Sequence, residues 1–249
     1  MRYLYLYLVL IVLLVASGAL GGDLPRLTVA TADGVPLSTP EGTGFHDQVV
    51  REACQRIGVQ LDIIHLPAER ALLNANDGFE EGVYVRVEGM EASYPNLRMV
   101  PEKIGDYEFV AFGKQSSAQL NGWDSLRDYH VAIITGWKIL ERNIVASKSL
   151  TKVKDASLLF RALVDDKVDL VVYNRLDGYG TIKELGLQGI HALDPPFATR
   201  EMFLYVHKSR EALVPQLAAA LRAMKDDGSY AAIRMRTLAP YLPAQTAEP

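Results

Sequence analysis

Short apolar segments typical of buried strands alternate with amphipathic helical segments along most of this 249-residue chain. Leu27–Thr31 and Leu61–Leu66 are typical of strands, and Phe45–Ile57 between them places its apolar residues on one helical face. The same pattern returns in the second half, with a strand at Val131–Thr135 and a helix at Ala156–Asp165. Strands that alternate with helices of this length predict an α/β fold with largely parallel sheets.

The remaining segments extend this pattern to the end of the chain. Gly58 follows the first helix and Asp155 precedes the helix at 156–165, the positions where glycine ends helices and aspartate caps them. We expect further strands at Gly82–Val87, Leu97–Val100, Phe109–Phe112, Asp169–Tyr173, Gly189–Leu193 and Met202–Val206, and further helices at Ala68–Asn76, Ile139–Val145, Gly178–Leu185, Glu211–Lys225 and from Ser229.

The N-terminal segment has the layout of a secretory signal peptide. Arg2 supplies positive charge, an apolar run from Tyr3 to Ala16 follows, and small residues occupy cleavage-site spacing at positions 17–21. The alternative is an uncleaved membrane anchor, but this run of about 14 residues is shorter than the roughly 20 that span a bilayer. We therefore predict a cleaved signal peptide at residues 1–21 and an exported protein. No cysteine lies near the cleavage point, so we do not expect a lipoprotein.

Charge, cysteine content and missing motifs narrow the function classes. The chain has 26 Lys and Arg against 30 Asp and Glu, and such an acidic chain without a basic block is a poor nucleic-acid binder. Cys54 is the only cysteine, so an internal disulfide is excluded. The sequence contains no phosphate-binding loop, no G-x-S-x-G elbow and no closely spaced histidine pair. We therefore expect no metal and no cofactor.

Four segments occur in an order and spacing that resemble one protein family. They are Gly44–Val59, Pro67–Gly78, the pattern R-x-x-G-x-E-x-x-Y-P-N-L from Arg86 to Leu97, and Leu163–Val172, before a closing long helix and D-G-x-Y. Together they resemble a divergent branch of the bacterial extracellular solute-binding proteins of family 3, the periplasmic components of polar amino acid uptake systems.

The resemblance implies a two-lobed fold of the periplasmic-binding-protein type (type II). It would have two mixed sheets flanked by helices and joined by two hinge strands. Lobe one would comprise residues 24–112 plus 202–238, lobe two residues 113–201, and residues 239–249 would form a flexible tail. A ligand that touches both lobes would close them about the cleft.

The resemblance places ligand contacts at two loops. Arg86 would grip a ligand carboxylate with its planar guanidinium, since family members use an arginine after this strand; the alternative is a surface salt bridge with Glu88. The loop formed by Thr135, Gly136, Trp137 and Lys138 resembles a second carboxylate contact, because backbone N–H groups at a helix start favour anions. Trp137 would either stack on the ligand or pack between the lobes.

Three further residues complete the predicted site. Asn174 aligns with the acidic residue that holds the ammonium group in family members that bind amino acids, and its neutral amide puts an ordinary α-amino acid ligand in doubt. Arg70 would be a second anion contact or would pair with Glu69 or Glu80. Asp33 lies in the first loop and either faces the cleft or serves a turn.

We therefore predict a monomeric periplasmic solute-binding protein, not an enzyme. It would capture a small polar molecule that bears a carboxylate and pass it to an ABC-type permease in the inner membrane. The alternatives are a secreted lyase of the cyclohexadienyl dehydratase type, with Glu69, Glu88 or Glu91 as general acid, and a ligand-sensing partner of a membrane receptor.

Overall fold

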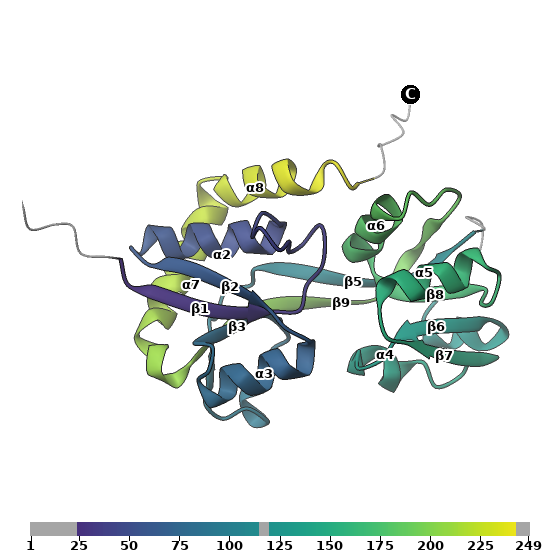
Figure 1. The fold of residues 1–249 in the computed structure, drawn as a ribbon, viewed down its shortest axis with the longest axis horizontal. Coiled ribbons are helices and arrows are strands. Elements are labelled where there is room, and N and C mark those ends of the chain that lie inside the picture. The colour runs from purple at the N-terminus through teal and green to yellow at the C-terminus, as the bar shows by residue number, and fades with distance from the viewer. Residues whose placement is uncertain (1–23, 115–119, 243–249) are drawn as a thin grey trace, which may run out of the picture.

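The computed structural model describes residues 24–114 and 120–242, so the predicted signal peptide and residues 243–249 of the predicted tail lie outside the described part. Helices and strands gather in two groups, and the strands β5 (Gly105–Gly113) and β9 (His191–His207) run between these groups (Figure 1). The α/β class predicted from the alternating pattern is confirmed.

The first group contains the beginning and the end of the described chain. Strand β1 pairs in parallel with β2 and β3, and α7 and α8 return from the C-terminal part to pack on α2. Its elements are β1 (Arg26–Thr31), α2 (Phe45–Arg56), β2 (Gln60–His65), α3 (Ala68–Asp77), β3 (Gly82–Arg86), β4 (Leu97–Met99), α7 (Val214–Asp226) and α8 (Ser229–Leu238), with short 3-10 turns at Met90–Ala92 and Lys208–Leu213.

The second group lies between the two connecting strands in the sequence. Strand β6 pairs in parallel with β7 and β8, and α5 and α6 pack on this sheet. Its elements are β6 (His130–Ile134), α4 (Lys138–Asn143), β7 (Ser149–Val153), α5 (Ala156–Val164), β8 (Leu170–Asn174) and α6 (Arg175–Glu184), after a 3-10 turn at Trp123–Asp128.

Strand β9 corrects two expectations. It is a single strand of 17 residues, where the sequence predicted separate strands at Gly189–Leu193 and Met202–Val206. Its pairing with β5 shifts register between residues 109 and 111, so the prolines at 195 and 196, which lack N–H groups, lie where regular pairing is interrupted. Because β9 also pairs with β3 and β4, the strands form one hydrogen-bonded order, β2-β1-β3-β9-β5-β8-β6-β7, rather than two separate sheets.

Helix boundaries follow the capping signals closely. Asp155 accepts a hydrogen bond from the backbone N–H of Leu158 at 2.8 Å and begins α5, as predicted. Gly58 has a positive φ of 71° just beyond α2. Helix α4 ends at Asn143 rather than Val145, and α6 begins at Arg175, three residues before the predicted start, with Asn174 at its N-cap position but without a side-chain capping hydrogen bond.

Asp155→Ala is expected to lower the free energy of unfolding by about 1 kcal/mol, because the first turn of α5 loses its only side-chain cap. Urea unfolding followed by circular dichroism measures this loss. Asp155→Ser should retain most of the stability, since a serine hydroxyl can accept the same N–H. Equal losses in the two variants would contradict the capping role.

Candidate ligand-binding site

Arg86 ends β3 in a backbone geometry that redirects its side chain. Val85, just before it, has a φ of 62°, which is unusual for a β-branched residue, and the pairing with β9 is bulged at this point. The Arg86 guanidinium donates to the carbonyl oxygens of Val85 and Ala68, both at 2.9 Å. Its Nε is buried and has no hydrogen-bond partner among the described residues. This donor is therefore unsatisfied in the described structure, and a ligand contact at Arg86 stays a prediction.

Burial and a nearby carboxylate act in opposite directions on Arg86. Burial lowers the pKa of the Arg86 guanidinium from its ordinary value, and the nearby carboxylate of Asp33 partly opposes that shift. Glu88, the predicted salt-bridge alternative, is exposed and forms no ion pair with Arg86 in the described structure. A partly desolvated guanidinium with free N–H groups forms strong paired hydrogen bonds with carboxylates.

Asp33 turns its carboxylate inward from the loop after β1. It accepts a hydrogen bond from the hydroxyl of Tyr107 and is paired with Nδ1 of His46 at 2.7 Å. The Asp33 side chain is only 5% exposed. These contacts hold the carboxylate in place, so Asp33 does more than serve the turn.

Asp177 is a buried acidic residue that the sequence analysis did not include in the predicted site. It lies in the first turn of α6, and its Oδ2 accepts from Nδ2 of Asn174 at 2.9 Å. Asn174 is 1% exposed and Asp177 is 3% exposed. The Oδ1 atoms of both have no partner among the described residues. The signal missed in the sequence was an acidic residue three positions after Asn174, in the first turn of the helix that follows the strand.

The charges of Asp33 and Asp177 act on one another. Burial raises the pKa of Asp177 well above its ordinary value, the Asp33 carboxylate raises it further, and the hydrogen bond from Asn174 lowers it. Burial also raises the pKa values of Tyr107 and Tyr173, and both carboxylates add to each shift. The structure thus brings acids from the first and second groups into one buried cluster.

Aromatic rings line this cluster. The Trp137 ring lies 6.3 Å from that of Tyr107, nearly parallel to it, and 4.8 Å from that of Tyr173. Phe109 meets Trp137 edge-on at 5.9 Å. Trp137 therefore packs against the connecting strand β5 and against β8 of the second group, while both of its predicted roles, packing between lobes and stacking on a ligand, stay predictions.

The remaining four predicted ligand contacts have no demonstrated place in the buried cluster. The N–H of Thr135 donates to Val153 at 2.8 Å and that of Gly136 to Glu141 at 3.2 Å, so both backbone donors have internal partners. Lys138 begins the short helix α4. Arg70 is exposed on α3, and its side chain forms no hydrogen bond or ion pair with a described residue. Ligand contacts at these four residues remain predictions.

A serine, a histidine and an aspartate meet nearby, but not as a nucleophilic triad. The hydroxyl of Ser38 donates to Asp47 at 2.6 Å, so its oxygen can only accept from Nε2 of His65, 2.8 Å away. A catalytic histidine would instead receive that proton. Asp47 also accepts the N–H groups of Thr39 and Gly44, both at 2.9 Å, and therefore stabilises the start of α2.

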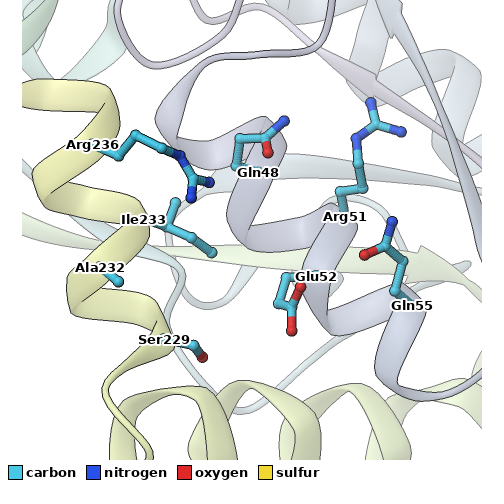
Figure 2. A pocket seen from close by; sticks show the side chains of 8 residues that line it. All are labelled: Gln48, Arg51, Glu52, Gln55, Ser229, Ala232, Ile233 and Arg236. Carbon is cyan, nitrogen blue, oxygen red and sulfur yellow. The ribbon is translucent and has the colours of Figure 1, made fainter.

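Other features of the described residues add no chemistry to the cluster. A hollow of about 240 Å³ lies between α2 and α8 and contains none of the predicted site residues (Figure 2). Within residues 24–114 and 120–242, no group of His, Cys, Asp or Glu side chains is arranged to hold a metal ion. Over the same residues, no helix is long and apolar enough to cross a membrane.

The three glutamates named for the lyase alternative are not buried acids. Glu69 and Glu88 are exposed, and Glu91 is half-buried, with its carboxylate accepting the N–H of Met99 at 3.1 Å. Burial raises the pKa of a different acid, Asp177.

The comparisons with known proteins bear on the fold. No family model and no curated protein matches the chain. Solved structures do match. A histidine kinase sensor domain with similarity to periplasmic binding proteins is 18% identical, with a TM-score of 0.71 over 86% of this chain and 96% of that one. The substrate-binding protein of an amino acid ABC transporter is 16% identical, with a TM-score of 0.67 over 86% and 99%.

A third similar structure is the ancestral amino-acid-binding protein AncCDT-1, described as a precursor of cyclohexadienyl dehydratase. It is 14% identical, with a TM-score of 0.67 over 86% of this chain and 95% of that one. At these identities the likeness concerns the fold and not the ligand. The chain therefore has the fold of the periplasmic amino-acid-binding proteins, in agreement with the family 3 resemblance of its sequence.

Proposed function

We propose that the protein is a periplasmic solute-binding protein whose ligand is a small, amino-acid-like zwitterion. The first group of elements (residues 24–112 and 202–238) and the second group (residues 113–201) are its two lobes, and β5 and β9 form the hinge. One observation carries the proposal: a buried donor without a partner, Nε of Arg86, and buried acceptors without partners, Oδ1 of Asn174 and Asp177, belong to the same cluster of interacting charges.

Each of these unpartnered polar atoms has a complementary group in an amino-acid-like ligand. Buried polar atoms without partners cost free energy that a ligand with complementary groups recovers. A ligand carboxylate would bind Nε of Arg86, and an ammonium group would bind the Oδ1 atoms of Asn174 and Asp177. The charge of the ammonium group would favour the ionised form of Asp177. Asp177 would thus supply the negative charge that the neutral amide of Asn174 lacks, and an amino acid ligand is proposed on that ground.

The proposed location and partner follow from the fold and the N-terminal sequence. A cleaved signal peptide at residues 1–21 would export the chain to the periplasm. There it would deliver its ligand, as a monomer, to the permease of an ABC-type importer. The amino acid ABC transporter protein of similar fold supports this assignment, while the similar sensor domain keeps a sensing role as the alternative.

A thermal-shift screen over amino acids, dicarboxylates and polyamines tests the proposal. A ligand at about 100 times its Kd stabilises the folded state by about 2.7 kcal/mol, which corresponds to a rise in Tm of about 5–10 °C for a chain of this size. We expect α-amino acids to give such rises. N-acetylated and methyl-ester derivatives of the same amino acids should not, because each lacks one of the two charges. Selective shifts by dicarboxylates or polyamines would contradict the zwitterion assignment.

A lyase of the cyclohexadienyl dehydratase type is the second candidate, and one observation favours it. Burial and the Asp33 carboxylate raise the pKa of Asp177, which favours the protonated carboxyl group that a general acid needs in order to donate to a leaving hydroxyl group. The acid would then be Asp177 rather than Glu69, Glu88 or Glu91. Incubating the protein with prephenate or arogenate and monitoring the aromatic product by absorbance tests this candidate; no product from the wild-type protein would exclude it.

A further inference from the structure

Helix α6 touches the first group of elements at two places outside the buried cluster. A Cβ atom added to Gly180 would lie 2.0 Å from the carbonyl oxygen of Val35, in the loop after β1. One turn further on, Nζ of Lys183 donates to the carbonyl oxygen of Pro240 at 2.9 Å and lies 4.4 Å from the centre of the Tyr241 ring. The residues after α8, predicted from the sequence to be a flexible tail, thus begin with a contact to α6 (Figure 1).

We infer that Gly180 and Lys183 on one face of α6 form a closing surface that sets how firmly the two groups hold together, without themselves touching the ligand. Asp177, Gly180 and Lys183 follow one another at intervals of three residues, so they form one stripe along the helix. Asp177 belongs to the ligand site, whereas Gly180 and Lys183 extend the stripe away from it. This inference rests on the proposed function, in which the two groups open and close about a ligand.

The start of α6 is anchored to the connecting strands. Arg175 donates to Glu108 in β5 and to Asp194 in β9, both at 2.5 Å. The opposite face of the helix packs on its own group, because a Cβ atom on Gly178 would lie 2.1 Å from the ring of Phe112 in β5, against which β8 pairs. Helix α6 therefore moves with the second group, and its stripe meets the first group only when the two approach.

The contacts of Gly180 and Lys183 affect the approach of the two groups in different ways. At Gly180 the absence of a side chain permits backbone approach, and any larger residue must hold the surfaces apart. At Lys183 the hydrogen bond and the cation–π contact are exposed and individually weak. A weak contact still changes the populations of two conformations when they differ little in free energy.

Gly180→Ala is the decisive test, and it can be made on the ligand-free full chain. Alanine is the better helix former, so if Gly180 lies on a surface that separates, the Tm should stay constant or rise. Small-angle X-ray scattering should then show a larger radius of gyration than for the wild-type protein. In a Trp123→Phe background, which leaves Trp137 as the only tryptophan, acrylamide quenching of its fluorescence should at least double.

Gly178→Ala is the matched control, two residues away on nearly the opposite face of the same helix. Its added methyl group meets Phe112 within the packed core, so the Tm should fall while the radius of gyration of the folded protein stays constant. If Gly180→Ala instead lowers the Tm as Gly178→Ala does, or leaves both scattering and quenching unchanged, the closing surface is refuted.

Lys183 provides a second variant that does not disturb the helix. Lys183→Met should increase Trp137 quenching, by less than Gly180→Ala does, and Lys183→Arg should restore the wild-type value, because arginine keeps both the donor and the cation. Lys148→Met, at an exposed lysine of the second group, should have no effect. These readouts need no ligand, so they remain decisive even if the thermal-shift screen finds none and the proposed function fails.

Discussion

Arg86→Ala is expected to weaken binding of a zwitterionic amino acid by about 100-fold or more, because the ligand carboxylate would be buried without its paired guanidinium. The Tm of the ligand-free protein should change little, because the guanidinium is only half satisfied there: its Nε has no partner among the described residues, and burial lowers its pKa. Isothermal titration calorimetry with the amino acid that gives the largest thermal shift measures the loss.

Two further arginine variants make this result specific. Arg86→Lys keeps the positive charge but cannot form two parallel hydrogen bonds, so we expect a smaller loss of about 10-fold. Arg70→Ala removes the other predicted anion contact, whose exposed side chain has no partner in the described structure, and should leave the Kd within about twofold of the wild-type value. A large fall in ligand-free Tm for Arg86→Ala, with unchanged affinity, would assign Arg86 to structure instead.

Asp177→Asn is expected to weaken binding of the same amino acid by about 30-fold or more, because the ammonium group loses its buried counter-charge. In the ligand-free protein the same variant should be more stable than the wild type at neutral pH, with a Tm higher by about 2–4 °C. Both effects arise because a buried carboxylate without a cation is costly, and the ligand supplies the cation.

The sign of the pH dependence follows from the raised pKa of Asp177. A carboxyl group whose pKa is higher in the folded than in the unfolded state favours folding at pH values below its ordinary pKa of 3.8, and this stabilisation is lost as the pH rises through the raised value. The Tm advantage of Asp177→Asn should therefore be smallest near pH 4 and grow toward neutral pH. Asp128→Asn, at an exposed acid, is the control. A constant difference between variant and wild type over this range would contradict the assignment.

Most elements of the fold could be predicted because their signals are local. The apolar core of β6 and the apolar face of α5, which Asp155 caps, are visible in the sequence. Strand β7 was missed because it lies at the edge of the sheet and is largely exposed, so it carries no apolar run and is defined by its pairing with β6. The continuity of β9 was missed because its two prolines indicate a break, whereas the pairing with β5 accommodates them in a register shift.

The candidate site could be predicted only in part, for a similar reason. Arg86 was selected because it lies at a strand end and matches a family pattern, and the structure shows it half-buried, with a buried Nε that has no partner among the described residues. Asp177 was passed over because an acid at the start of a helix is usually a surface residue that interacts with the helix dipole. Its pKa depends on its burial, on the hydrogen bond from Asn174 and on the charge of Asp33, a residue 144 positions earlier (177 − 33).

By itself the sequence determined the α/β class, the helix caps, and an arginine at the end of a central strand, because apolar periodicity and capping act between residues a few positions apart. Only the tertiary structure decided that the charge of Asp33 acts on Asp177, that Trp137 packs against β5 and β8, and that Gly180 faces Val35 while Gly178 faces Phe112. These contacts join residues far apart in the chain, and their distances and burial depend on how whole elements pack, which no short segment specifies.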